Sequence, residues 1–285
     1  LAKLARGKLR AHLIQFLDTD TVLDRIPPHE AAHGFRAGRS LRTCLDGHAG
    51  HEVVVRMDLA QWFPSIRAAR VLAVFRTAGY PDDVATVLTG LATSRVPDDV
   101  LDSAPREGRS MSSRWLTLQH YRFAHLPQGA PTSPALANLC AFRLDRRLSG
   151  LARAAGAHYT RYADDLVFSG DDRFRRSLPR FLPRVPRVVE AEGFRLAAAK
   201  TRVMGRSARQ SFGGLVLNVR PGPSRREREL LEAILHNCVR HGPASQNRAG
   251  HPDFRAHLAG RIAWVSSFLP EHGRQLQDLW ARIEW

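Results

Sequence analysis

Between residues 51 and 219, short apolar runs rich in β-branched residues alternate with stretches of helical periodicity. Residues 51–59 (HEVVVRMDL) predict a strand with an aspartate near its end. Residues 158–170 (HYTRYADDLVFSG) predict a β-hairpin whose two apolar arms flank an Ala-Asp-Asp tip. Residues 211–219 predict one further strand.

Helical periodicity fills the intervals between these strands. Residues 67–79 predict one helix, and an apolar stripe predicts another, with Ser133 as N-cap and Pro134 as its first residue. The stripe consists of Leu136, Cys140, Leu144 and Leu148. Residues 174–192 have the apolar spacing of a helix, interrupted by three prolines. Residues 94–119 are weakly periodic and rich in turn residues, which predicts an insertion or a long loop.

After residue 219 the pattern becomes entirely helical. Ser224 and Glu227 form a capping box in front of an apolar stripe, and Gly242 ends the predicted helix. The stripe runs through Leu230, Leu231, Ile234, Leu235, Cys238 and Val239. Two more helices are predicted near residues 252–268 and 271–283. The chain is therefore predicted to be an α+β protein, a β/α body followed by helices.

The composition is that of a globular chain with 285 residues, a mass of 31.8 kDa and 44% hydrophobic residues. Cys44, Cys140 and Cys238 form no CxxC pair, so their spacing indicates neither a zinc site nor a disulfide framework. No apolar run has the length of a membrane span and no signal peptide is recognisable, so a cytoplasmic location is expected. The chain begins at Leu1 rather than Met, so an upstream segment is expected to be missing.

The formal net charge is +16, from 43 Lys and Arg against 27 Asp and Glu. Such an excess favours a polyanionic partner, although a general preference for arginine would also raise the charge. Its distribution favours the first explanation, since residues 173–209 hold eleven basic residues and two acidic ones. Lys3, Lys8 and Lys200 are the only lysines, so forty basic residues are arginines, which suit phosphate binding and base stacking.

Asp58, Asp164 and Asp165 are the candidate metal-binding residues. In a ferredoxin-like βαββ arrangement the strand ending at Asp58 and the hairpin are neighbours, which would bring the three carboxylates together. Adjacent carboxylates repel each other unless a cation lies between them. Two Mg²⁺ ions held in this way can stabilise both the attacking and the leaving oxygen of phosphoryl transfer. Two ordinary Asp-Asp pairs lack comparable apolar flanks: Asp82-Asp83 and Asp171-Asp172.

Five ordered motifs between about His33 and Asn218 resemble those of reverse transcriptases. They are residues 57–66 (MDLAQWFPSI), similar to the first palm motif; 126–134 (LPQGAPTSP), similar to LPQGxxxSP; 162–165 (YADD), similar to the YxDD box; 193–200, similar to the fourth palm motif; and 212–215 (FGGL), similar to the primer-grip strand. Their order and spacing match the family. The five together are highly specific, whereas each alone is not.

Within the family the chain looks most similar to bacterial retron-type enzymes, through residues 33–40, 130–134 and 161–170. Two segments depart from the retron pattern. Residues 44–48 keep only the histidine of an Asn-Ala-x-x-His element, and residues 212–214 replace Val-Thr-Gly. A related defence-associated or unclassified bacterial reverse transcriptase fits equally well. The Lys- and Arg-containing fingers motif is not found, which again predicts a missing upstream segment.

The resemblance implies a right-hand polymerase fold, with fingers at residues 1–50, a ferredoxin-like palm at 51–218 with an insertion near 91–126, and an all-helical thumb at 219–285. The implied activity is RNA-directed DNA polymerase, using two Mg²⁺ ions, with Mn²⁺ as a substitute. The implied partners are an RNA template, a DNA or RNA primer and dNTPs, without a membrane. Retron enzymes copy a dedicated structured RNA into branched DNA in antiphage defence, which implies an effector protein of unidentified kind.

The resemblance also assigns roles to individual residues. Metal binding falls to Asp58, Asp164, Asp165 and the backbone carbonyl of Leu59. Phe63 is the steric gate that excludes a ribose 2′-hydroxyl. The other nucleotide-binding residues are Gln128, Gly129, Arg36 and Arg39. The primer and template contacts are Tyr162, Gly213, Gly214, Arg225 and Arg226, and the arginines of residues 173–209 are expected to grip the duplex backbone.

Lys200 is the candidate general acid for the pyrophosphate leaving group. A general acid must be able to lose a proton, which arginine essentially cannot, so a lysine kept in an arginine-rich chain fits this role. Two other functions stay open: a viral-type RNA-dependent RNA polymerase, and a catalytically idle, maturase-like nucleic-acid-binding protein. Gly-Asp-Asp at the hairpin and a polar residue at position 63 are typical of the first. Intact Asp58, Asp164, Asp165 and Lys200 argue against the second.

Overall fold

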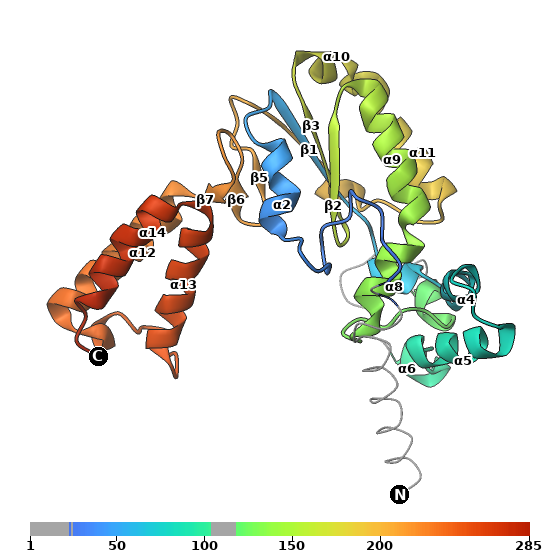
Figure 1. Ribbon diagram of the computed structural model, residues 1–285, viewed down its shortest axis with the longest axis horizontal. Helices are drawn as coiled ribbons and strands as arrows, with labels where there is room; N and C mark the ends of the chain where they lie inside the picture. The colour runs from blue at the N-terminus through green and yellow to red at the C-terminus, as the bar shows by residue number, and fades with distance from the viewer. Residues whose placement is uncertain (1–22, 24, 104–117) are drawn as a thin grey trace, which may run out of the picture. The chain divides into compact units, whose positions relative to one another are not determined.

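The computed structural model describes residues 23, 25–103 and 118–285, and the chain divides into two compact units (Figure 1). The first unit comprises the described residues up to Cys44 and those between Glu52 and Val203. The second comprises Leu45–His51 and Met204–Trp285. The assignment of fingers, palm and thumb to residue ranges stays a prediction.

A four-stranded sheet forms the centre of the first unit, although the last two residues of its fourth strand are assigned to the second unit. Its strands are β1 (Val53–Asp58), β2 (His158–Tyr162), β3 (Asp165–Gly170) and β4 (Arg202–Gly205). The strand order is β2-β3-β1-β4, and β3 is antiparallel to both of its neighbours. With helices between β1 and β2 and between β3 and β4, this is the order of a ferredoxin-like βαββαβ unit. The strand predicted at residues 51–59 and the hairpin predicted at 158–170 are confirmed.

Helices make up most of the rest of this unit. In chain order they are α2 (Leu41–Leu45), α3 (Trp62–Ser65), α4 (Ala68–Thr77), α5 (Asp82–Ala92), α6 (Asp98–Asp102), α8 (Thr132–Cys140), α9 (Phe142–Ala155), α10 (Asp172–Phe181), α11 (Arg184–Ala191) and the 3₁₀ helix η2 (Ala198–Lys200). Helices α9 and α10 pack directly on the sheet. The helix predicted at residues 67–79 is confirmed as α4, with Arg67 as its N-cap.

The two faces of the sheet carry different side chains, because successive residues of a strand point to opposite faces. Met57, Tyr159 and Phe168 point to one face and are buried in the core beneath α9 and α10. Asp58 and Asp165 alternate with these residues and belong to the other face. The carboxylates and the hydrophobic core therefore lie on opposite sides of the same sheet.

The stripe from Leu136 to Leu148 lies on two helices rather than the single one predicted. Ala141, with φ −89° and ψ 1°, separates α8 from α9. Ser133 is not the N-cap, since α8 begins one residue earlier and the Ser133 hydroxyl donates a hydrogen bond to the Pro127 carbonyl at 2.7 Å. The apolar stripe itself is confirmed, because Leu136 and Leu148 are fully buried.

Residues 174–192 also form two helices, α10 and α11, where one interrupted helix was predicted. Leu182 and Pro183 separate them, and Pro179 lies inside α10. A proline removes a backbone donor and clashes with the preceding turn, which favours a break between prolines this closely spaced. The buried apolar residues are Phe174, Phe181, Val185 and Val189, as the spacing predicted.

Part of the insertion predicted at residues 94–119 lies outside the described residues, namely 104–117. In the described part, α6 is a short helix where a loop was predicted. Ser94, the first residue of the segment, and His125, six residues beyond its end, exchange backbone hydrogen bonds of 2.9 and 3.0 Å.

In the second unit, residues 211–219 form a hairpin instead of the predicted single strand. Strands β5 (Ser211–Phe212), β6 (Leu215–Val216) and β7 (Gly222–Pro223) make a small antiparallel sheet. Gly213 and Gly214, with φ of 55° and 82°, form the turn between β5 and β6. A two-residue hairpin turn of this kind needs positive φ at both positions, which glycine adopts without steric cost.

The helices predicted for the C-terminal part are confirmed, with ends that differ by a few residues. This unit contains the helices η1 (Asp46–His48), α12 (Arg225–His241), η3 (Pro243–Ser245), α13 (Phe254–Phe268) and α14 (Pro270–Ala281). The capping box is present, since the Ser224 hydroxyl accepts from the Glu227 backbone N–H at 3.2 Å. Leu231, Leu258 and Leu276 bring the three long helices together in one core. No described helix of either unit combines the length and apolarity needed to cross a membrane.

Candidate active site

The pairing of β1 with β3 brings together carboxylates that are more than a hundred residues apart in sequence. Asp58 and Asp165 are direct partners in the antiparallel register. Asp164 occupies the two-residue turn between β2 and β3, and its backbone carbonyl accepts a 2.8 Å hydrogen bond from the Leu59 N–H. Ala163, the other turn residue, has φ 54°. The end of β1 and the tip of the hairpin are therefore joined through the backbone as well.

Lys200 lies beside Asp58. Its Nζ donates a hydrogen bond of 2.8 Å to Asp58 Oδ2, although the two residues are far apart in sequence. Residue Ala197 contributes to this placement, since its N–H donates to the Asp58 backbone carbonyl at 2.8 Å. The hydrogen bond from the ammonium to the Asp58 carboxylate raises the pKa of Lys200. Lys200 is therefore protonated and directed toward the candidate site.

Arg56 is a further charged residue at this site, and the sequence interpretation missed it. Its Nε and Nη2 donate to the two carboxylate oxygens of Asp165 at 3.0 and 3.3 Å. Residues two apart on a strand share a face, so Arg56 lies on the same face as Asp58. An arginine at an alternate position of an otherwise apolar strand was the available signal. Asp165 is thus already paired, while Asp164 has no such arginine partner in the described part of the chain.

The electrostatics of Asp164 and Asp165 fit a divalent cation. The pKa of each carboxyl is raised, chiefly by burial and further by repulsion from neighbouring carboxylates. Partly buried carboxylates that repel each other supply the oxygen donors that Mg²⁺ takes. Among the described residues, no three His, Cys, Asp or Glu side chains are already arranged as a metal-binding group, which agrees with the pairing of Asp165 to Arg56.

A fully buried charged network lies on the opposite face of the sheet, beneath the hairpin tip. Arg161 and Asp145 both have 0% exposure, and the Arg161 Nε and Nη2 donate to the Asp145 carboxylate at 2.8 and 2.6 Å. The Tyr159 hydroxyl donates to the same carboxylate at 2.8 Å. A guanidinium is tolerated at such a depth only when its charge is paired and its donors are satisfied.

The remaining nitrogen of Arg161 reaches the turn itself. Nη1 donates to the backbone carbonyl of Ala163 at 2.9 Å and to the side-chain oxygen of Asn138 at 3.0 Å. Asn138 in turn donates to the Gly34 carbonyl at 2.8 Å. A Cβ added at Gly34 would lie 2.6 Å from the Ala163 nitrogen, so only glycine fits there. These contacts fix the backbone that carries Asp164, and the sequence interpretation assigned none of them.

The predicted steric gate, Phe63, lies on α3, which begins four residues after Asp58. Gln61 precedes this helix with φ 52°, and its side-chain oxygen accepts from the Tyr121 hydroxyl at 3.1 Å. Trp62 stacks on Phe194 and lies under the Arg161 guanidinium, at 5.0 Å from the ring centre. Phe63 therefore follows the well-packed ring of Trp62 and is itself half-buried.

The other predicted nucleotide-binding residues belong to the same unit. Gln128 and Gly129 are exposed, and Gly129 has φ 87°. Arg36 and Arg39 lie near the buried His33, whose pKa falls to about 4, first through burial and then through the two arginine charges. Their roles on an incoming nucleotide stay predictions.

The predicted primer and template residues are divided between the units. Tyr162 is the direct partner of Asp165 in the β2–β3 register, so it belongs to the candidate site. Gly213 and Gly214 form a turn of the second unit. Arg225 and Arg226 begin α12 of that unit and are exposed, and Arg225 pairs with Glu229 at 2.6 Å.

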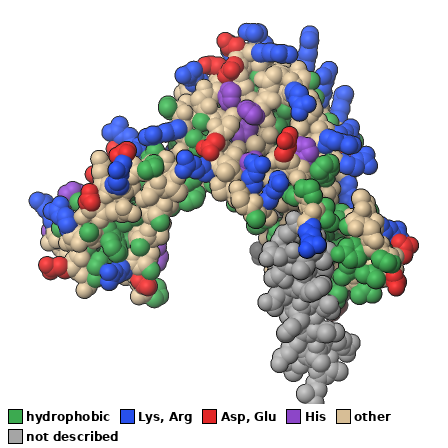
Figure 2. All heavy atoms as spheres, in the orientation of Figure 1, with side chains coloured by type: hydrophobic (Ala, Val, Ile, Leu, Met, Phe, Trp, Pro, Cys, Tyr) green, Lys and Arg blue, Asp and Glu red, His purple; other side chains and the backbone are tan. Residues whose placement is uncertain are grey.

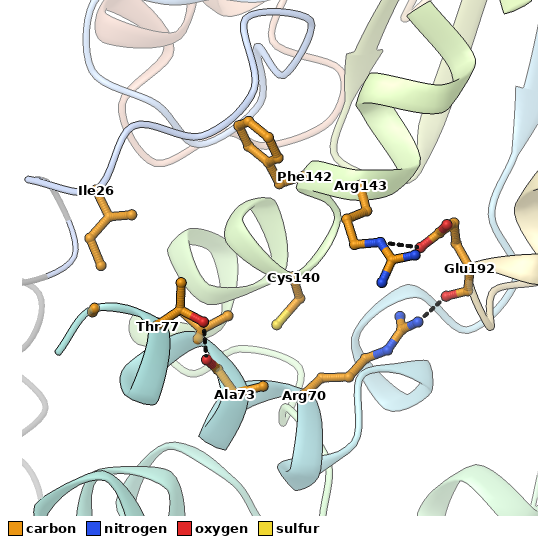
Figure 3. Close-up of a pocket in the computed structure, with 10 residues that line it drawn as sticks. Ile26, Arg70, Ala73, Thr77, Cys140, Phe142, Arg143 and Glu192 are labelled. Carbon is orange, nitrogen blue, oxygen red and sulfur yellow. Dashed lines mark hydrogen bonds and ion pairs between the residues drawn. The ribbon is translucent and has the colours of Figure 1, made fainter. Parts of the chain in front are cut away.

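A pocket of about 460 Å³ lies elsewhere in the first unit, beside α4 and the junction of α8 and α9 (Figure 3). Its walls are mainly apolar. At one side, Arg70 contacts the Glu192 backbone carbonyl and Arg143 contacts the Glu192 carboxylate. None of the predicted site residues lines it. The pocket is therefore not part of the candidate active site.

Comparison with known proteins agrees with this geometry. Residues 9–219 match the model of the family described as reverse transcriptase (RNA-dependent DNA polymerase). The chain belongs to the reverse transcriptase family. Membership of this family implies the polymerase fold, and the mixed helix and sheet architecture is compatible with that fold.

Retron enzymes are among the relatives of this reverse transcriptase chain. The retron Mx65 reverse transcriptase of Myxococcus xanthus is 40% identical over 262 residues, covering 90% of this chain and 55% of the relative. The retron Mx162 enzyme of the same species is 38% identical, covering 89% and 52%. The retron Ec86 enzyme of Escherichia coli is 28% identical, covering 92% and 70%. These matches confirm the expected resemblance to bacterial retron-type reverse transcriptases. The chain spans about half the length of the two Myxococcus relatives.

Proposed function

We propose that this chain is the polymerase core of an RNA-directed DNA polymerase, which adds dNTPs to a primer 3′-hydroxyl and releases pyrophosphate. The observation that carries the proposal is the β1–β3 register. It places Asp58 opposite Asp165, next to Asp164 and within hydrogen-bonding distance of Lys200. Family membership supports the same reaction.

Asp58 and Asp164 are the carboxylates that would hold two Mg²⁺ ions, with the Leu59 carbonyl as a further ligand. Ions bound there would neutralise charge on the reacting phosphate and on the departing pyrophosphate. Arg56 keeps Asp165 paired, so this carboxylate contributes more to the shape of the hairpin tip than to metal binding. Lys200 is the proton donor to the leaving group, and Phe63 limits the space at the sugar 2′-position.

The relatives' names extend the proposal to the template. They are retron reverse transcriptases, so we propose that the native template is a dedicated structured RNA copied in a retron-like antiphage system. Arg36, Arg39, Gln128 and Gly129 would contact the dNTP. Tyr162, Gly213, Gly214, Arg225 and Arg226 would contact primer and template. The proposed location is the cytoplasm.

Primer extension on an RNA template with Mg²⁺ tests the polymerase assignment. DNA product from dNTPs, and not RNA product from rNTPs, is the expected result. RNA product from rNTPs would favour an RNA-dependent RNA polymerase. Tight nucleic-acid binding without any product would favour the maturase-like, catalytically idle alternative.

Lys200→Ala is expected to lower kcat by roughly 10²- to 10⁴-fold, the usual contribution of a general acid, with little change in the KM for dNTP. Lys200→Arg is the matched control for charge, because arginine can keep the ion pair with Asp58 but cannot give up a proton. We expect Lys200→Arg to stay close to the alanine variant in single-turnover assays. Recovery of most of the rate by arginine would show that the residue acts through charge alone.

Phe63→Ala is expected to weaken discrimination against ribonucleotides by roughly 10- to 100-fold, the range that a single packing contact supplies. The measurement is the ratio of kcat/KM for a dNTP and its matching rNTP. Phe142→Ala, at an exposed phenylalanine of α9, is the control and should leave the ratio unchanged. An unchanged ratio in Phe63→Ala would remove Phe63 from the gate role.

A further inference from the structure

A stripe of arginines follows the outer surface of α10 and α11. Its members are Arg173, Arg176, Arg180, Arg184 and Arg187, all of them exposed. Their spacing of three and four residues places those of each helix on one side. The opposite side of the same helices carries Phe174, Phe181, Val185 and Val189, which are buried in the core. We refer to the five arginines as the α10–α11 arginine face.

The charges of this face are not neutralised locally. In the part of the chain that the structure describes, none of its five arginines takes part in an ion pair, whereas the adjacent Arg175 pairs with Asp172 at 3.0 Å. Helix α9, which packs against both helices, adds the exposed Arg146 and Arg153. Figure 2 shows Lys and Arg side chains gathered over this region of the first unit.

The α10–α11 arginine face looks away from the candidate active site. Phe181 contacts Phe168 on the core face of the sheet, with ring centres 5.1 Å apart, so α10 covers that face. Asp58 and Asp165 are on the other face. A sheet and a helix of about 10 Å diameter therefore separate the arginines from the carboxylates. The expectation that the arginines of residues 173–209 grip the duplex backbone stays a prediction, and for the members on α10 and α11 the contact would lie on the side of the sheet away from the carboxylates.

The chemistry of the face fits phosphates of a nucleic acid better than a lipid surface. Arginine presents a planar fork of donors that matches a phosphate group, and all five members are arginine. A helix that binds at a membrane interface exposes large apolar side chains beside its charges. Here the apolar residues Phe174 and Phe181 of α10 are buried at 0% and 2% exposure. Backbone phosphates of a helical nucleic acid need no apolar contact.

We propose that the α10–α11 arginine face binds the phosphate backbone of a base-paired segment of structured RNA that lies outside the primer–template duplex. The proposal rests on the proposed function, since a polymerase that copies a dedicated folded RNA must hold parts of it that are not being copied. The face would then select and retain the folded RNA, while the carboxylate face of the same sheet performs the chemistry.

The test separates binding at the two faces. The protein is first saturated with a short primer–template whose primer ends in a dideoxynucleotide, together with the next dNTP, so that the candidate active site is occupied. A fluorescent RNA hairpin with a stem of about 16 base pairs, enough to present two successive minor grooves, is then titrated in. The variant replaces all five arginines of the face with glutamine. A charge-matched control replaces five exposed arginines of the second unit: Arg220, Arg240, Arg248, Arg274 and Arg282.

We expect the hairpin Kd of the face variant to rise at least tenfold at about 0.15 M salt. The slope of log Kd against log salt should fall by about 4.5, because each of the five lost phosphate contacts contributes about 0.9 to it. Primer extension on the short duplex should keep its kcat and KM, which also shows that the variant is folded. The control variant should bind the hairpin within a few fold of the unmodified protein.

Three results would overturn the inference: unchanged hairpin binding, an equal loss in the control variant, or a parallel loss of primer extension, since the face would then not be separate from the active site. Loss of binding to phosphatidylserine vesicles without loss of hairpin binding would assign the face to a membrane instead. Failure of the unmodified protein to extend a primer would contradict the proposed function and not this surface, because hairpin binding is read without turnover.

Discussion

Asp164→Asn is expected to abolish DNA synthesis, with a loss of roughly 10³-fold or more in kcat. An amide is of nearly the same size as a carboxylate but brings no negative charge to a cation. Metal ions stabilise a phosphoryl-transfer transition state by several kcal/mol, and each 1.36 kcal/mol of barrier changes the rate by a factor of about ten. Asp164 lies in the turn between β2 and β3 without a competing arginine partner among the described residues, whereas Asp165 is paired to Arg56. Of the two hairpin carboxylates, Asp164 is therefore the one on which we expect metal binding to depend most.

Single-turnover primer extension measures this loss, and fluorescence anisotropy with a labelled primer–template measures binding. Binding should stay within about threefold of the unmodified protein, because nucleic-acid affinity comes mainly from phosphate contacts with arginine and lysine. Asp83→Asn, at an exposed Asp-Asp pair of α5, is the matched control and should be fully active. Undiminished synthesis by Asp164→Asn would overturn the metal assignment.

Removal of the buried Arg161–Asp145 pair is the second large effect expected. Loss of one partner alone would leave an unpaired buried charge and cost about 3–5 kcal/mol of stability, whereas apolar replacement of both is often close to neutral. The informative variant therefore combines Arg161→Met and Asp145→Leu with Tyr159→Phe, so that the Tyr159 hydroxyl does not lose its acceptor. We expect it to fold, with a melting temperature near that of the unmodified protein.

Its kcat is nevertheless expected to fall about 100-fold. The Ala163 carbonyl loses the hydrogen bond from Arg161, and a displacement of about 1 Å in a reacting group can cost this much. The left-handed φ of 54° at Ala163 makes the turn depend on such support, since that region disfavours residues with a Cβ. Binding of Mn²⁺ without turnover, followed by electron paramagnetic resonance, should weaken in parallel, while primer–template affinity stays the same.

Arg147→Met with Glu192→Leu is the control for this second prediction. It removes another ion pair of α9, in which Arg147 lies 2.8 Å from the buried Glu192 carboxylate. This pair does not contact the hairpin. This control should keep both its rate and its Mn²⁺ affinity. A folded Arg161 variant with unchanged rate and Mn²⁺ affinity would show that the network supports stability alone.

The elements that the sequence predicted correctly are those with strong local signals. The alternation at residues 51–59 and 158–170 matches β1 and the β2–β3 hairpin, and the Ser224–Glu227 capping box begins α12 as expected. The ordered motifs identified the family, because their residue types and spacing are properties of the chain itself. The same motifs named Asp58, Asp164 and Lys200, which the structure brings together.

The errors in the sequence prediction concern places where backbone dihedrals change within an apolar pattern. Ala141 divides one predicted helix into α8 and α9, and Leu182 and Pro183 divide another into α10 and α11. Gly213 and Gly214 turn the predicted strand of residues 211–219 back on itself. Periodicity reports which residues are buried, and burial was predicted correctly in both helical regions, but it does not report where the chain bends.

The sequence by itself determined the family, the order of most elements, and the identity of the carboxylates and the lysine expected at the site. Only the tertiary structure decided which groups surround them. Arg56 pairs with Asp165, which is 109 residues away in sequence. Arg161 donates to the Ala163 carbonyl of the hairpin turn and is itself held by Asp145 and Asn138, from two helices on the far side of the sheet. It also decided that the α10–α11 arginine face points away from the carboxylates. The physical reason is that periodicity specifies the side of an element to which a residue points, whereas its charged partners come from elements that become neighbours only when the sheet and its helices pack together.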